Sequence, residues 1–218
     1  MDQVADQTVT LENWDELTDD QLDVLERKIA AKYMRIVPWG AVTWGIGNTL
    51  LWLSLWPLVL LDILPLWLGF IIATFNCTLA YLPSHEAQHS IIAGKGKPLR
   101  WLNELVGHVS LIPFSAPFRV MRATHMAHHK HTNDPELDVD YDTTARNGWH
   151  FLYKSILRRQ PGSKSKEAYP AALARTGQSH LMLDILIVNI FFLAVLFGMA
   201  WTGHAIEAAL LWWLPKNI

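Results

Sequence analysis

Two long apolar stretches dominate the first half of the chain, at residues 37–58 and 61–82. Each is long enough to cross the hydrocarbon core of a bilayer as a helix, which takes about 20 mostly apolar residues. Only a very short connection separates them, and Asp62 is the single charged residue within it. The pattern therefore predicts a transmembrane helical hairpin.

Two further apolar stretches lie near the C-terminus. Residues 181–201 form a third candidate span whose only charge is Asp184, near one end. Residues 205–214 are apolar but too short to cross a bilayer, and the chain ends at Ile218. We interpret residues 205–218 as the beginning of an incomplete fourth span. The whole pattern is typical of an all-α integral membrane protein.

Basic residues indicate which side of the membrane each connection faces. Four of them precede the first span, and thirteen of the eighteen Lys and Arg residues lie between Lys95 and Arg175. The Asp62 turn and the residues directly after Trp201 contain none. Because cytoplasmic loops are enriched in Lys and Arg, both basic regions are predicted to face the cytoplasm of a multi-pass protein. The N-terminus is then cytoplasmic, whereas His204 lies on the opposite side.

Residues 1–36 are predicted to form a cytoplasmic amphipathic region ahead of a membrane domain at residues 37–218. The stretch from Thr18 to Gln21 resembles a capping box, which opens a helix. The apolar residues that follow at helical spacing are Leu22, Leu25, Ile29, Tyr33 and Ile36. This pattern fits a helix on the membrane surface or a helix packed against protein, and both alternatives remain open.

Composition supports the membrane assignment. The chain is 51% hydrophobic, yet its net charge is only −2, a balance that does not suit a nucleic-acid-binding protein. The single cysteine, Cys77, lies within an apolar stretch and is interpreted as a packed thiol. Residues 105–117 are apolar but too short to span, so we expect them to be interfacial, re-entrant or buried. Residues 158–177 are polar, and we expect a solvated segment there.

Histidine is concentrated in two short clusters, which contain six of the ten histidines. Imidazole is a strong ligand for iron and zinc, and residues three or four apart share a helical face. His85 and His89 can therefore converge on one point, and the same geometry brings His125, His128 and His129 together. Five imidazoles exceed the needs of a single tetrahedral zinc site, so the spacing favours a site for two metals.

The first cluster also reads H-E-x-x-H, the helical motif of zinc proteases in which the glutamate acts as general base. Glu86 would hold that role, and a membrane-embedded metalloprotease is a competing hypothesis. The second cluster argues against it, because such a protease needs one further ligand rather than three more imidazoles. A catalytically inert metal-binding membrane protein is a third hypothesis.

The two clusters in this setting resemble the membrane fatty acid desaturase superfamily. The pattern is H-x-x-x-H after the second span, followed some thirty-five residues later by H-x-x-H-H-K-H-T-N-D-P-E-x-D. The resemblance implies cytoplasmic histidine boxes on a four-span bundle, holding two non-haem iron ions that activate O2. The iron ligands would then be His85, His89, His125, His128 and His129.

The resemblance also implies an oxygen-dependent lipid oxidoreductase. Fatty acyl desaturation is favoured, and hydroxylation or ketolation of a lipid or carotenoid are alternatives within the superfamily. An external ferredoxin-like or cytochrome-type protein would supply electrons. The superfamily carries a third box after its fourth span, and this sequence has no counterpart. We therefore expect a fragment of a longer protein, which alone binds iron poorly and catalyses nothing; a natural variant with an incomplete site is the alternative.

Several polar residues near the second cluster could hold the ligands in place. Metal-bound imidazoles usually donate their other N–H to a carboxylate or carbonyl. The candidates for such supporting contacts are His131, Asp134, Asp138 and His180. The acidic residues from Asp134 to Asp142 could instead attract a basic electron donor or form a solvated loop. His108 and His150 are interpreted as structural.

Overall fold

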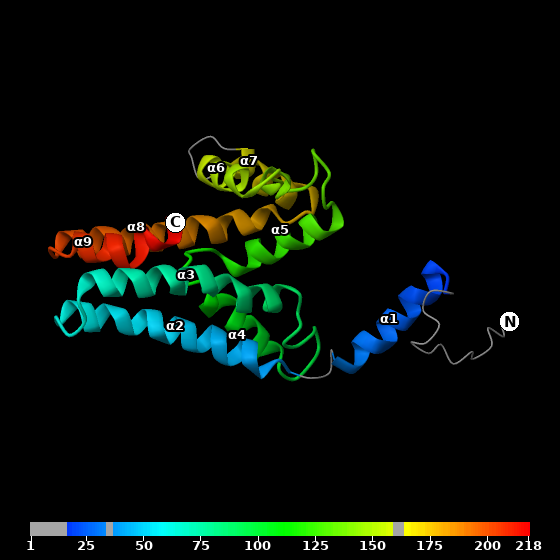
Figure 1. Ribbon diagram of the computed structural model, residues 1–218, viewed down its shortest axis with the longest axis horizontal. Helices are drawn as coiled ribbons and strands as arrows, with labels where there is room; N and C mark the ends of the chain where they lie inside the picture. Colours follow the sequence, from blue (N-terminus) through cyan, green and yellow to red (C-terminus); the bar gives the residue numbers. More distant parts are fainter. Residues whose placement is uncertain (1–16, 34–36, 159–163) are drawn as a thin grey trace. The chain divides into compact units, whose positions relative to one another are not determined.

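The computed structural model describes residues 17–33, 37–158 and 164–218. Every regular element within these ranges is helical, and no strand occurs among them. The chain divides into two compact units, Met1–Val37 and Pro38–Ile218. The first unit contains α1, and the second contains α2 to α9 (Figure 1). The all-helical prediction is therefore confirmed for the described residues.

Helix α1 (Asp19–Tyr33) begins where the sequence predicts. The backbone N–H of Thr18 donates a hydrogen bond of 3.0 Å to Oε1 of Gln21, which is one half of a capping box. The first three positions of the predicted apolar stripe are half-buried. The last two positions of the stripe are Tyr33 and Ile36. The side chain of Tyr33 and the whole of Ile36 lie outside the described part of the chain. Contact of this helix with a membrane stays a prediction.

Helices α2 (Trp39–Leu60) and α3 (Leu66–Gln88) form a helical hairpin (Figure 1). The chain reverses in a short turn where Asp62 has a φ of 57°, in the left-handed region. Within the hairpin, Nδ2 of Asn48 donates to the backbone carbonyl of Asn76 at 3.0 Å. Nδ2 of Asn76 donates in return to the backbone carbonyl of Asn48 at 2.6 Å and to its Oδ1 at 2.9 Å. These bonds engage the side-chain NH2 groups of both asparagines, which would be costly to leave unpaired in apolar surroundings, whereas Oδ1 of Asn76 has no hydrogen-bond partner among the described residues.

Two helices among the described residues are long and apolar enough to cross a membrane. One is α3, and the other runs over Ser179–Trp201 and includes α8 (Met182–Trp201). Helix α2 is nearly as long and carries no charged residue, but it is not one of these two. Its place in a bilayer, and with it the number of spans, stays a prediction. Cys77 of α3 is buried, as predicted.

Helices α4 (Arg100–Ser110) and α5 (Phe118–Lys130) connect the hairpin to the second histidine cluster. Helix α4 packs against both α2 and α3. Asn103 donates from Nδ2 to the backbone carbonyl of Ala87 at 3.0 Å, close to the end of α3. Residues 105–117 comprise the second half of α4 and the turn before α5, and five of these thirteen residues are buried.

Residues 158–177 were expected to be a solvated segment; most of the described residues from 167 to 177 are exposed or half-buried, but the segment is helical and two of its residues are buried. Helix α7 (Lys164–Arg175) occupies most of it, after α6 (Gly148–Arg158). Ala172 and Leu173 of α7 are buried, in two small cores that include residues of α5. Alanine carries little hydrophobic signal in a sequence, so a helix with one narrow apolar side is easily taken for a polar loop.

The C-terminal segment packs back against the hairpin. After α8 come α9 (Ala205–Ala208), a π-helical turn (Ala209–Trp213) and a 3-10 turn (Pro215–Asn217). The indole Nε1 of Trp52 in α2 donates to the backbone carbonyl of Leu211 at 3.0 Å. The core at this end consists of Trp52, Leu55, Val59, Ala73, Phe192, Leu211 and Trp212. The predicted partial span is therefore helical, and its relation to a bilayer stays a prediction.

Candidate metal centre

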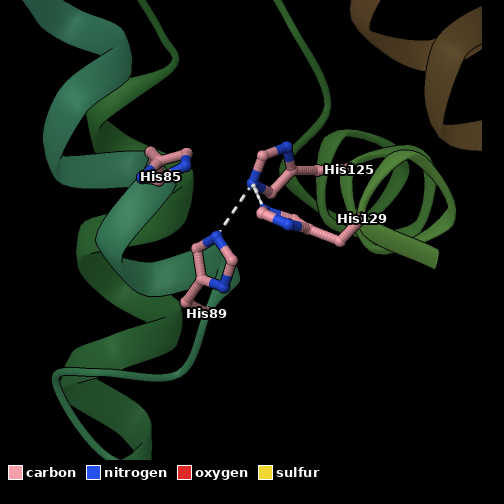
Figure 2. Close-up of side chains that lie close together, drawn as sticks. All are labelled: His85, His89, His125 and His129. Atoms are coloured by element: carbon pink, nitrogen blue, oxygen red, sulfur yellow. Dashed lines mark hydrogen bonds between the residues drawn. The ribbon is translucent and has the colours of Figure 1, made fainter. Parts of the chain in front are cut away.

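The two histidine clusters lie at the ends of two helices in contact with each other. His85 occupies the last turn of α3, and His89 caps the C-terminus of that helix. His125, His128 and His129 lie in the second half of α5. Figure 2 shows imidazoles from both helices turned toward one another. The contact between α3 and α5 thus brings together residues that are far apart in the sequence.

Four imidazoles form a compact group, which we call the four-histidine cluster: His85, His89, His125 and His129. One nitrogen from each lies within 4.8 Å of those of the other three. The Nε2 atom of His125 is 2.9 Å from Nε2 of His89 and 3.1 Å from Nε2 of His129 (Figure 2). The ring centroid of His85 lies 4.6 Å from that of His125. His125 therefore has each of the other three as a near neighbour.

The dimensions of the four-histidine cluster fit a metal ion. With metal–nitrogen bonds of about 2.0–2.1 Å, two nitrogens on one ion are at most about 4.2 Å apart. The spread of 4.8 Å is only slightly larger, so small side-chain rotations would place all four nitrogens on one ion. Imidazole suits iron, zinc, copper and nickel. The donor set therefore fits a transition metal, and iron is one of those it suits.

Burial and neighbouring imidazoles keep two members of the cluster uncharged. They lower the pKa of His125 to about 4, with burial as the largest cause and the imidazole of His85 as the next. The pKa of His89 is lowered by the same two causes. A neutral imidazole retains the lone pair with which it binds a metal. Neither side chain has to lose a proton before binding near neutral pH.

His128 lies apart from the four-histidine cluster and pairs with Asp138. Its Nδ1 lies 2.6 Å from Oδ1 of that carboxylate, which accepts the Nδ1–H. The backbone N–H groups of Asn133 and Asp140 donate to the same carboxylate, at 2.9 and 2.8 Å. Burial raises the pKa of Asp138, but these hydrogen bonds, the one from His128 first, keep it below its ordinary value. With Nδ1–H engaged, Nε2 of His128 retains a lone pair for a metal.

Among the described residues, no hydrogen bond or ring contact joins the other three predicted supporting side chains to the five imidazoles. Oδ1 of Asp134 accepts from the backbone N–H groups of Glu136 and Leu137, at 2.8 and 3.0 Å, and so shapes the turn after α5. His131 is the C-cap of α5. His180 lines a separate cavity. A supporting role for these three residues stays a prediction.

A charged network that holds α5 against α4 was not predicted. The carboxylate of Glu104 accepts a 2.7 Å hydrogen bond from Nη1 of Arg122 and also pairs with Arg100 in its own helix. Nη1 of Arg100 donates to Oγ of Ser90, the residue after His89, at 2.9 Å. The network thus connects α5 to the end of the first histidine cluster. The i, i+4 spacing of Arg100 and Glu104 is its one sequence signal.

Two cavities border α5 without including the four-histidine cluster in their walls. An apolar cavity of about 400 Å³ lies between the start of α5, α8 and Trp212. Another, of about 500 Å³, has a basic lining that includes Arg119, Arg122, Lys130 and His180. Although both are large enough for part of a lipid, a molecule in either would contact side chains other than the candidate ligands. We therefore assign neither as the reaction site.

Comparison with known proteins shows the family of this chain. The family model for fatty acid desaturase matches residues 61–217, well over half of the chain. This chain belongs to the fatty acid desaturase family. The match includes both histidine clusters and every helix from α3 onward. Membership in this family argues against the zinc-protease hypothesis, in which Glu86 is the general base. Oε1 of Glu86 lies 3.7 Å from Nδ1 of His85.

Curated relatives of this chain share one name, sn-1 oleoyl-lipid 12-desaturase. That of Anabaena variabilis is 35% identical over 77 residues, which are 35% of this chain and 19% of the relative. That of Synechocystis sp. is 40% identical over 63 residues, 29% of this chain and 17% of the relative. The aligned part of this chain thus spans only about a fifth of the length of these relatives. No solved structure matches the chain.

The substitution Asp138→Asn is expected to lower metal affinity about 10- to 100-fold. The amide has no negative charge, and its NH2 group would face a backbone N–H that now donates to the carboxylate. His128 would lose the partner that holds its ring. The measurement is a metal titration of the purified protein. Asp134→Asn is the matched control, because its remaining oxygen can still accept both turn hydrogen bonds; an equal loss in the two variants would contradict the assigned role of Asp138.

Proposed function

We propose that this protein is a membrane desaturase that uses two non-haem iron ions and O2 to introduce a double bond into the acyl chain of a lipid. The observation that carries the proposal is the four-histidine cluster, assembled from α3 and α5 in a member of the fatty acid desaturase family. The printed names of the relatives support an acyl lipid as the class of substrate.

The histidines of both clusters would hold the iron. The four-histidine cluster fits one ion, and Nε2 of His128 would be available to the other. When bound, the iron supplies the capacity to activate O2 and oxidise an unactivated methylene. Asp138 keeps the ring of His128 in one orientation, and the bond between Glu104 and Arg122 keeps α5 beside α4. These contacts position the donors before any metal arrives.

The stoichiometry of the proposed reaction requires a partner protein. Desaturation removes two hydrogen atoms from neighbouring carbons of the acyl chain, and O2 is reduced to two water molecules. The acyl chain supplies two of the four electrons needed, so two more electrons and two protons must come from outside. We propose a ferredoxin-like or cytochrome-type donor on the cytoplasmic side as their source.

The proposal is tested on the full-length protein to which this chain belongs, reconstituted with Fe²⁺, reduced ferredoxin, O2 and an oleoyl lipid, with an anaerobic reaction as control. Mass spectrometry of the acyl chains identifies the chemistry. Desaturation lowers the mass by two hydrogens, hydroxylation adds one oxygen, and ketolation exchanges two hydrogens for one oxygen. A dienoic product formed only with O2 supports the proposal. Iron-loaded protein that leaves every acyl chain unchanged would overturn it, and an oxygenated product would favour the hydroxylase or ketolase alternative.

We also propose that the protein crosses the membrane several times, with the N-terminus and both histidine clusters on the cytoplasmic side. In a Cys77→Ser background, Thr132→Cys and Thr202→Cys place single thiols at exposed positions, one directly after the second cluster and one after α8. In intact cells, a membrane-impermeant maleimide is expected to label position 202 at once, and position 132 only after permeabilisation. The reverse pattern would show that the clusters face outward.

A further inference from the structure

Helix α6 presents its apolar side outward. Its exposed apolar residues on one face are Trp149, Leu152, Tyr153 and Leu157, spaced i, i+3, i+4 and i+8. The exposed fraction ranges from 47% for Leu157 to 83% for Trp149. His150 and Lys154, which lie off this face, are half-buried, and Nζ of Lys154 donates to the carbonyl of Thr144 at 2.8 Å. An amphipathic helix of a water-soluble protein has the opposite arrangement, with the apolar side packed inward.

The sequence around α6 is strongly basic. No acidic residue occurs between Asp142 and Glu167. The basic residues of this stretch are Arg146, Lys154, Arg158, Arg159, Lys164 and Lys166. Basic segments close to a membrane are attracted to the anionic lipids of the cytoplasmic leaflet. The charge around α6 therefore complements a surface of anionic headgroups.

The chain returns to a candidate membrane span soon after α6. About twenty residues separate its last residue from Ser179, where that span begins. A connection of this length allows α6 to reach the bilayer surface. Trp and Tyr are the side chains most enriched at that depth, because their rings combine an apolar body with a polar group. Trp149 and Tyr153 on the exposed face match this preference.

We propose that α6 is an interfacial helix, which inserts its apolar face into the headgroup region of an anionic membrane leaflet. The outward apolar face, the aromatic residues on it and the basic flanks all fit lipid as the occupant. The proposal depends on membership in a membrane protein family and on no step of the proposed reaction. Loss of desaturase activity would therefore leave it standing.

The test measures how deeply each side of α6 lies in lipid. In a Cys77→Ser background, Leu152→Cys and Tyr153→Cys put an NBD fluorophore on the apolar face, and Ser155→Cys is the matched control off that face. The full protein is reconstituted in vesicles of phosphatidylcholine with or without phosphatidylglycerol, and quenching by brominated acyl chains is recorded. With phosphatidylglycerol, we expect at least about twofold stronger quenching at positions 152 and 153 than at position 155. We expect this difference to shrink in phosphatidylcholine alone.

Equal quenching on both sides of the helix would overturn the proposal. So would strong quenching at position 152 that does not depend on phosphatidylglycerol, since the basic flanks would then have no role. Absent quenching together with a blue-shifted NBD emission would show that protein covers the face, either another segment or a second copy of the chain. Two labelled positions on the apolar face ensure that one poorly folded variant does not decide the result.

Discussion

The variant His125→Ala is expected to bind no iron at the four-histidine cluster and to form no desaturated product. Nε2 of His125 lies within 3.1 Å of the corresponding atoms of His89 and His129, and its ring neighbours that of His85. Removing this imidazole leaves three imidazoles for one ion. These three are fixed to two helices, because His85 and His89 lie at the end of α3 and His129 lies on α5. Iron per chain is measured by elemental analysis, and product by mass spectrometry.

The matched control for that variant is His204→Ala, which removes an imidazole in the turn after α8 and should leave iron content and product unchanged. Both variants should retain their helices, which circular dichroism of the purified proteins checks. Normal iron content in His125→Ala would refute the cluster as the metal site. Normal iron content without product would instead assign His125 a role in the reaction itself.

The variant Gly107→Ala is expected to lose both stability and iron, although residue 107 is no candidate ligand. A Cβ at this position would lie 2.7 Å from Cδ2 of Phe118, and closer still to Cε2 and Cζ of the same ring. Phe118 is buried at the first turn of α5, so the ring has little room to withdraw. Overpacking of this kind costs about 1–3 kcal/mol. Each kcal/mol lowers the melting temperature by about 2–4 °C in a protein of this size.

Iron is lost in Gly107→Ala because α5 must move. The helix carries His125 and His129, and their nitrogens have to stay within a few ångströms of those on α3. The double variant Gly107→Ala with Phe118→Leu frees space for the methyl group and should recover most of the iron. Gly47→Ala is the matched control, since nothing lies within 4 Å of its new Cβ and alanine favours the helix. An iron content that the smaller side chain at 118 does not restore would contradict this steric explanation.

Much of the architecture could be predicted because its signals are local. The turn at Asp62 lies between two uninterrupted apolar stretches, so the hairpin follows from helix length and hydropathy. The pairing of His85 with His89, and of His125 with His129, follows from the helical repeat. These features depend on residues at most a few turns apart. A single sequence contains that information directly.

The features that could not be predicted depend on contacts between distant segments. The helical repeat alone groups His128 with His125 and His129, yet His128 turns to Asp138 because the following turn presents a carboxylate already held by two backbone N–H groups. Arg122 meets Glu104 only because the fold brings α5 to α4. Helix α7 was missed because its buried Ala172 and Leu173 pack against residues outside that helix, including Val120 and Ala127 of α5. The partner lies 10 residues from His128 and 18 residues from Arg122, which is beyond the reach of the helical repeat.

The hydrogen bonds between Asn48 and Asn76 fix the position of α3 along α2, and with it the position of the first histidine cluster at the end of α3. Sliding α3 along α2 by one residue would break all three hydrogen bonds between Asn48 and Asn76, in surroundings that offer few substitutes. From Asn76 to His85 the helix rises about 14 Å. Because Asn76 and His85 lie in the same helix, the distance between them is fixed by that helix. Under the proposed function, an acyl chain that enters from the bilayer would meet the cluster at one depth, and that depth would determine which of its carbons comes within reach.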